Sequence, residues 1–187
     1  MKKDFEFICT LMNDFVRQAH IKNTFNVIKD QEITGWETWF QIEFATFLSK
    51  CDSVGSWERE VPYRVDKRKK SDKDKVIVDF KVRRKHTYLN RMITIEFKQH
   101  TSITTCLTNM ISDLQKIESI QSSSSCDMRS YWSIGIHPKK YKYDPFFDRK
   151  TIKDKILEKS KYDTFGIITD CILTRYIPKT NFAYTIF

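Results

Sequence analysis

The chain has 187 residues, of which 40% are hydrophobic and 30% are charged, and its net charge is +9. This length suffices for one domain with a hydrophobic core, and the low content of glycine and proline, 4 each, excludes collagen-like and disordered proteins. No apolar run approaches the roughly 20 residues of a membrane-spanning helix. Acidic residues at Asp4 and Glu6 come too early for a secretory signal peptide, so we expect a cytoplasmic protein with no membrane partner.

The cysteine pattern agrees with this expectation. The five cysteines are widely spaced, and no pair has the Cys-x-x-Cys spacing of a zinc site. Their odd number argues against a disulfide framework. We therefore expect free, buried thiols in a reducing compartment.

Positive charge is concentrated in two segments of the sequence. Residues 64–85 contain 11 Lys/Arg and 4 Asp, and residues 138–161 contain 9 Lys/Arg and 4 Asp/Glu. This distribution favours a polyanionic partner, most simply nucleic acid, and the alternative is a pair of solvated loops. Within the first segment, the candidates for contacts with backbone phosphates are Lys67, Arg68, Lys69 and Lys70.

The first half of the chain reads as helices followed by strands. Hydrophobic residues recur every three or four positions and predict a helix over about 4–30. A second helix is expected after Gly35, with Thr34 as its capping residue. Three strands follow at 57–64, 76–82 and 92–98, and the short links between them predict an antiparallel meander.

The second half alternates between helix and strand. A helix is expected over about 103–120, then a serine loop at 122–125, then a strand at 131–136. This strand–helix–strand order predicts that the fourth strand runs parallel to the third. The remaining expected elements are a short helix at about 149–160, a strand at 165–169 and an edge strand at 182–187. We expect a single α/β domain over residues 1–187, with a mixed sheet.

Three charged side chains interrupt the apolar strands. Asp79 follows Val78 in the second strand, and Glu96 and Lys98 flank Phe97 in the third. Because strand side chains alternate between faces, all three can share one face of a paired sheet. Two carboxylates there would form a hard oxygen site suited to Mg²⁺, with Mn²⁺ as the alternative ion.

This constellation suits the hydrolysis of a phosphodiester bond. A divalent cation stabilises charge that develops on a phosphate and lowers the pKa of a bound water. Lys98 can hold or activate the attacking water and offset the phosphate charge. The alternative is a structural one, in which Glu96 and Lys98 form an ion pair on a solvated face and Asp79 is an edge charge.

A fourth acidic candidate lies on the helix that precedes the strands. Glu43 falls on the aromatic face of that helix, where a carboxylate needs a partner. Glu37 is a competitor at the edge of the same stripe. The alternative for Glu43 is a hydrogen-bonded structural role in the core.

The order of these residues resembles that of the PD-(D/E)XK nuclease superfamily, which has the restriction-endonuclease-like fold. The resemblance covers about residues 34–136 and implies an αβββαβ core with a mixed central sheet flanked by helices. By resemblance, Asp79, Glu96 and Lys98 match the motif, and Glu43 matches the acidic residue that many members carry on the first core helix. Val78 stands where the motif has proline. The N-terminal helix 4–30 and a basic extension at 138–187 would flank this core.

The resemblance implies Mg²⁺-dependent cleavage of nucleic acid, with DNA as the expected substrate. Glu43, Asp79 and Glu96 would bind the metal, and cleavage of both strands of a duplex would favour a homodimer. Gln99 and Lys116 are further candidates for substrate contact, although Gln99 could instead end its strand and Lys116 could be an isolated helix lysine.

Two other functions stay open on the same fold. One is a non-catalytic module that binds nucleic acid or protein, such as a phage-type inhibitor. The other is a nuclease subunit that acts only within a larger assembly. By analogy, compact chains of this kind also occur alone in phages and mobile elements.

Overall fold

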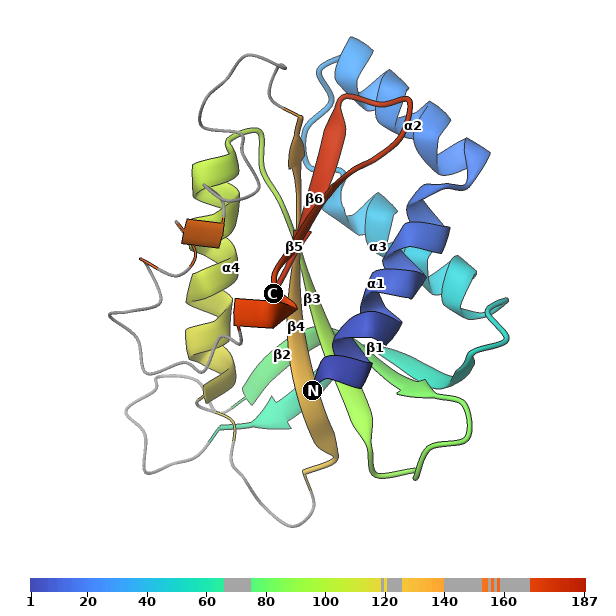
Figure 1. Ribbon diagram of the computed structural model, residues 1–187, viewed down its shortest axis with the longest axis vertical. Coiled ribbons are helices and arrows are strands. Elements are labelled where there is room, and N and C mark those ends of the chain that lie inside the picture. Colours follow the sequence, from blue (N-terminus) through green and yellow to red (C-terminus); the bar gives the residue numbers. More distant parts are fainter. Residues whose placement is uncertain are drawn as a thin grey trace.

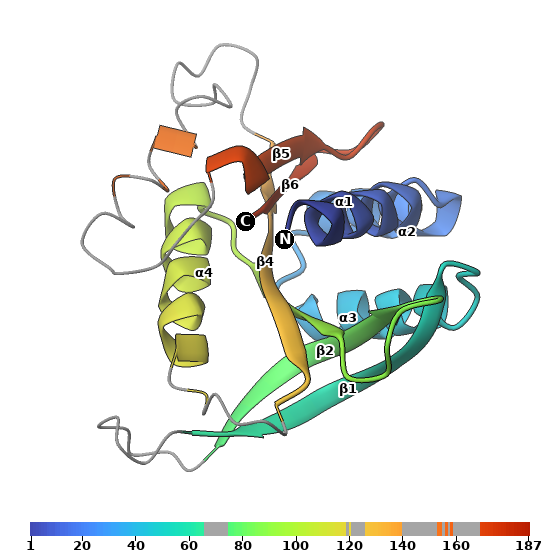
Figure 2. The same cartoon turned by 60° about the horizontal axis from the view of Figure 1, so that its bottom comes forward.

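The computed structural model describes residues 1–65, 75–118, 120, 126–139, 153, 154, 156, 158 and 169–187. These residues form an open, mixed sheet of six strands in the order β1-β2-β3-β4-β6-β5. Helices α1, α2 and α3 lie on one side of this sheet and α4 lies on the other (Figures 1 and 2). Within the described ranges, no helix combines the length and the apolar character that crossing a bilayer requires.

The predicted N-terminal helix is in fact two helices. α1 spans Lys2–Val16 and α2 spans Ala19–Asp30, with Arg17 ending the first and Gln18 preceding the second. α3 spans Glu37–Leu48, and its first residue is preceded by Trp36 with no side-chain cap. The expected cap at Thr34 is therefore wrong. Gly35 has a φ of 71°, a left-handed conformation that glycine adopts without a steric penalty.

The predicted meander is confirmed. β1 (Val54–Arg64), β2 (Lys75–Arg84) and β3 (Met92–Gln99) pair in antiparallel order. The chain then passes through α4 (Ile103–Glu118) into β4 (Met128–Pro138). β4 runs parallel to β3, as the strand–helix–strand pattern predicts. The element order from α3 to β4 is thus α-β-β-β-α-β.

The C-terminal strands differ from the expectation. β6 (Phe182–Ile186) is not an edge strand, because it pairs with β4 on one side and with β5 (Leu173–Tyr176) on the other. β5, which the sequence did not predict, forms the edge. Residues 165–168 of the expected strand, the serine loop and most of the expected helix at 149–160 lie outside the described residues, and Thr169 begins a short 3-10 turn, η2 (Thr169–Cys171).

An aromatic core fixes the sheet against α1 and α3. The ring of Phe44 lies 5.0 Å from that of Phe97, 5.3 Å from that of Phe80 and 5.2 Å from that of Phe15, each in an edge-on arrangement. Phe80 and Phe97 are fully buried in this core. The alternation of the strands therefore turns Asp79, Glu96 and Lys98 toward the opposite face, which α4 covers.

α4 packs closely on β4 because a glycine lies beneath it. A Cβ atom at Gly135 would meet Met110 of α4 and would lie 2.8 Å from the sulfur of Cys106. Gly135 is also the register partner of Lys98 on β3. The missing side chain thus allows α4 to approach the strand that carries the motif lysine.

Candidate active site

β2 leaves β3 at the position of the two motif carboxylates. β2 pairs with β3 only over Phe80–Val82, opposite Ile93–Ile95, but it pairs with β1 as far as Lys75. The part of β2 that precedes Phe80 pairs only with the end of β1. At this end, β1 and β2 curve away together toward the lower end of α4 (Figure 2). Asp79 and Glu96 stand at this opening.

Where β2 and β3 separate, the two carboxylates accept hydrogen bonds from backbone N–H groups that no longer pair with the neighbouring strand. The backbone N–H of Phe97 donates to Asp79 Oδ2 at 2.7 Å, and the N–H of Asp79 donates to Glu96 Oε2 at 3.2 Å. Each acid therefore accepts a hydrogen bond from the strand of the other. This exchange holds both side chains side by side and satisfies two amide groups that have lost their ladder partners.

Lys98 links this pair to α4. Its ammonium nitrogen lies 3.2 Å from Glu96 Oε1 and 2.9 Å from Oδ2 of Asp113. Asp113 is only 4% exposed, and sequence reasoning did not identify it. The only signal for it in the sequence was an acidic residue on the apolar stripe of the helix after the motif. The structure thus adds a third carboxylate to the site.

Glu37 adds a fourth carboxylate from the opposite side of the sheet. The first turn of α3 extends past the end of β3, and Glu37 Oε2 accepts a hydrogen bond from the backbone N–H of Gln99 at 3.1 Å. Burial raises the pKa of Glu37, the charge of Lys98 acts to lower it, and the charge of Asp79 acts to raise it. Glu37 is therefore part of the same electrostatic group.

The acids outnumber the cation, and their pKa values reflect this. Burial, and then the charge of Asp79, raise the pKa of Glu96 to about 7, while Lys98 opposes the change. Burial also raises the pKa of Asp79, against the opposing effects of the Phe97 hydrogen bond and of Lys98. Burial acts to lower the pKa of Lys98, but the charge of Glu96 and the contact with Asp113 outweigh it and raise that pKa. Lys98 therefore keeps its proton at neutral pH.

A tyrosine from β4 borders the acidic group. Burial, followed by the charges of Glu96, Asp113 and Asp79, raises the pKa of Tyr131 well above its ordinary value. Its hydroxyl therefore stays neutral and can donate a hydrogen bond. Sequence reasoning did not identify Tyr131, because nothing in its strand pattern separates it from a packing residue.

The structure does not bring Glu43 into this group. Its Oε2 lies 3.3 Å from Nε2 of His20 on α2. The reason is geometric: α3 crosses the sheet face opposite to the motif residues, and only its first turn reaches past the end of β3. Glu37 lies in that turn, and Glu43 lies almost two turns further along.

The other sequence candidates lie outside the acidic group or outside the described residues. Gln99 engages Glu37 through its backbone, and its side chain is half-buried. The side chain of Lys116 is outside the described part of the chain, as are all four basic residues at 67–70.

The donor set fits a magnesium ion better than a metal that needs several protein ligands. The described residues contain no group of three or more His, Cys, Asp or Glu side chains arranged to hold a metal ion. Mg²⁺ is commonly held by one or two carboxylates, with water and substrate phosphate completing its shell. Asp79 and Glu96 form such a pair, and a cation between them would offset the repulsion that raises the pKa of Glu96.

Comparison with known proteins identifies no relative. No family model matches the chain, and neither the curated proteins nor the solved structures yield a similar chain. What the structure establishes is the fold class, an α/β protein whose described residues form four α-helices and an open six-stranded mixed sheet.

Proposed function

We propose that the chain is a Mg²⁺-dependent phosphodiesterase that cleaves nucleic acid, with DNA as its substrate. The observation that carries this proposal is the carboxylate pair Asp79 and Glu96 at the opening between β2 and β3, with Lys98 paired to Glu96. The element order from α3 to β4 and the spacing of the motif residues both support a nuclease of the PD-(D/E)XK type. On this proposal Glu37, rather than Glu43, is the acidic residue that the first core helix supplies.

Asp79 and Glu96 would hold the metal, with Mn²⁺ as an alternative to Mg²⁺. When bound, the ion would stabilise negative charge on the phosphate and lower the pKa of a coordinated water. Each of these carboxylates also accepts a backbone N–H, so its position is fixed before any ion arrives. This preorganisation reduces the conformational cost of binding.

Lys98 would act as a charged hydrogen-bond donor. Its raised pKa means that it holds its proton, so it positions a water molecule or a phosphate oxygen and does not abstract a proton. The carboxylate of Asp113 holds the ammonium group from the side of α4. Glu37 secures the end of β3 one residue beyond Lys98. Both acids are positioning residues in this scheme.

A non-catalytic nucleic-acid-binding module is the second candidate. It is favoured by one observation, namely that Lys98 is already paired with two carboxylates, as in a structural ion-pair network. The two candidates differ in one measurable respect. A nuclease of this kind cleaves nucleic acid only with a divalent cation, whereas a binding module binds it without a cation and does not cleave it.

The test is a cleavage assay over a panel of substrates. The wild-type chain is incubated with supercoiled plasmid, linear duplex, single-stranded DNA and RNA, in Mg²⁺, in Mn²⁺ and in EDTA. We expect cleavage of DNA in Mg²⁺ or Mn²⁺, none in EDTA, and none by Lys98→Met. Nicking without linearisation would argue for one copy acting at a time, and linearisation would argue for a homodimer. Binding of DNA without cleavage in any metal would favour the second candidate.

A further inference from the structure

Hydrogen bonds hold the turn between β2 and β3 in a defined conformation. Both the N–H and the hydroxyl of Thr87 donate to the carbonyl of Arg84, at 3.3 and 2.7 Å. The N–H of Arg91 donates to the carbonyl of Tyr88 at 3.1 Å, and the N–H of Lys85 donates to the carbonyl of Ser53 at 2.9 Å. These bonds fix the hairpin tip and therefore the direction of its side chains.

This tip exposes two large hydrophobic side chains to solvent. Leu89 is 81% exposed and Tyr88 is 76% exposed, and no other large hydrophobic side chain in the described ranges is as exposed. Adjacent exposed hydrophobic residues at a fixed turn have no role in the core. Their burial in a complex would be favourable, which marks the tip as a contact site.

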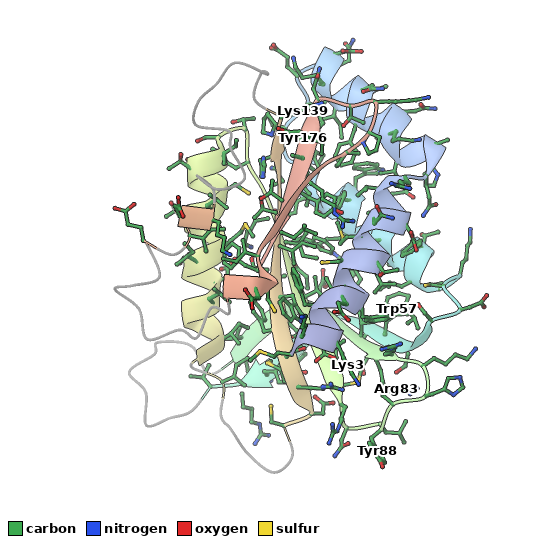
Figure 3. All side chains as sticks on the ribbon, viewed as in Figure 1. Lys3, Trp57, Arg83, Tyr88, Lys139 and Tyr176 are labelled. Carbon is green, nitrogen blue, oxygen red and sulfur yellow. The ribbon has the colours of Figure 1, made fainter. Side chains whose placement is uncertain are left out.

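The sequence of the hairpin carries several cations and no acid. Residues 83–91 include Arg83, Arg84, Lys85 and Arg91 but neither Asp nor Glu. The guanidinium of Arg91 lies 5.6 Å from the centre of the Tyr88 ring, and that of Arg84 lies 5.7 Å from the Phe7 ring of α1. Lys3, one turn before Phe7, projects at the same end of the molecule as Arg83 and Tyr88 (Figure 3).

We propose that this hairpin, residues 83–91, is a contact surface for single-stranded nucleic acid. Arg84, Lys85 and Arg91 bind backbone phosphates, and Tyr88 and Leu89 pack against unpaired bases. Positive charge beside exposed aromatic and aliphatic side chains is the combination that such strands require, because every base has a face that can stack. The inference rests on the proposed function for its ligand, but it concerns a surface separate from the candidate site.

The hairpin lies at a defined distance from the candidate site. Arg84 follows Asp79 by five positions along β2. At about 3.4 Å per residue, the strand places them about 17 Å apart. At the per-strand spacing of duplex DNA, about 3.4 Å, this distance corresponds to about five nucleotides beyond the cleaved bond, and a more extended single strand spans it with fewer.

The test of the phosphate contacts is a salt titration of binding. Fluorescence anisotropy measures the affinity for labelled single-stranded and duplex oligonucleotides in EDTA, where the metal site is not used. The variant carries Arg84→Ser, Lys85→Ser and Arg91→Ser. A control with the same change in net charge carries Lys22→Ser, Lys29→Ser and Lys179→Ser, none of which belongs to the hairpin. Loss of three contacts should reduce the slope of log affinity against log salt by about 2 for single strands and by about 3 for a duplex.

The test of the stacking contact compares a variant that removes the Tyr88 ring with one that keeps it. Tyr88→Ser should weaken binding of the single strand by about 5- to 150-fold without changing the salt slope. Tyr88→Phe keeps the ring and should bind like the wild type. A greater loss for single strands than for duplex is expected, because the bases of a duplex are already stacked.

Two outcomes would overturn the inference. In the first, the hairpin and control variants change the slope equally, which would reduce the effect to overall charge. In the second, the hairpin variant loses binding to vesicles that contain phosphatidylserine while its oligonucleotide slope matches the control, which would assign the surface to anionic membranes. A wild type that binds through the hairpin but cleaves nothing would contradict the proposed function alone. Cleavage with an unchanged slope would contradict the hairpin alone.

Discussion

Asp79 and Glu96 serve the backbone as well as the candidate chemistry. Each accepts an N–H that the divergence of β2 and β3 leaves without a strand partner. An alanine at either position would leave a buried donor unsatisfied, at a cost of about 1–3 kcal/mol. Asn and Gln keep an acceptor oxygen and remove the charge, so they separate the two roles.

The stability of the metal-free protein should fall as pH rises through the titration of Glu96. The pKa of Glu96 is about 7 in the folded chain, against an ordinary value of 4.5. Between these values the folded state binds more protons than the unfolded state, so the free energy of unfolding decreases with pH, by up to about 3 kcal/mol. Urea unfolding in EDTA from pH 4.5 to pH 8 measures this. Glu96→Gln should have a flatter profile, and parallel profiles would contradict the assignment.

Magnesium should reverse this loss at pH 8. An ion that binds only the folded state at 100 times its Kd adds about 2.7 kcal/mol, which for a chain of this size raises the Tm by roughly 5–10 °C. Thermal unfolding with and without Mg²⁺ measures the shift. Asp79→Asn removes one metal ligand, so Mg²⁺ should raise its Tm only slightly. An equal shift in that variant would place the ion elsewhere.

The two glutamates of α3 should differ in their effect on cleavage. Glu37 bonds the strand end beside Lys98, whereas Glu43 pairs with His20. Glu37→Gln should therefore slow cleavage by about tenfold or more, because a positioning contact is weakened, and Glu43→Gln should slow it less. Single-turnover rates in Mg²⁺ give the comparison. The reverse order would return Glu43 to the site.

At the scale of elements, the approach of α4 to β4 determines whether Asp113 can reach Lys98. Gly135→Ala would drive a methyl group into Cys106 and Met110 and push the helix outward. We expect a loss of about 1–3 kcal/mol in stability, typical of overpacking, and a lower cleavage rate. Met110→Ala in the same chain should restore part of both, because it vacates the space. Denaturant unfolding and cleavage rates of the single and double variants test this. If the double variant recovers neither stability nor rate, the loss does not come from a clash between the new methyl group and Met110.

The sequence predicted those elements whose patterns are local. The meander, α4 and the parallel β4 follow from apolar runs, alternation and link lengths. The break between α1 and α2 did not, because Arg17 and Gln18 carry neither glycine nor proline. β5 was missed because it has only four residues, two of them the polar-tipped Arg175 and Tyr176, and it becomes a strand by pairing with β6.

At the scale of the whole molecule, the candidate site is assembled from both faces of the sheet. Asp79, Glu96 and Lys98 could be predicted because alternation along two strands places them together. Glu37 was only a competitor of Glu43 and Asp113 was not identified, because their positions depend on how α3 and α4 dock on opposite faces. Helical periodicity shows which face of a helix is buried, but it does not show which turn reaches the end of a strand.

We propose that the carboxylate pair and Lys98 form a metal-dependent phosphodiesterase site. The most direct measurement is cleavage of supercoiled plasmid in Mg²⁺ by the wild type, Asp79→Asn and Glu96→Gln, purified in parallel to control for contaminating nucleases. We predict cleavage by the wild type that EDTA abolishes, and a loss of at least about 100-fold in each variant, because each removes a ligand charge. Equal rates in all three proteins, or a wild type that leaves every plasmid intact in Mg²⁺ and in Mn²⁺, would contradict the claim.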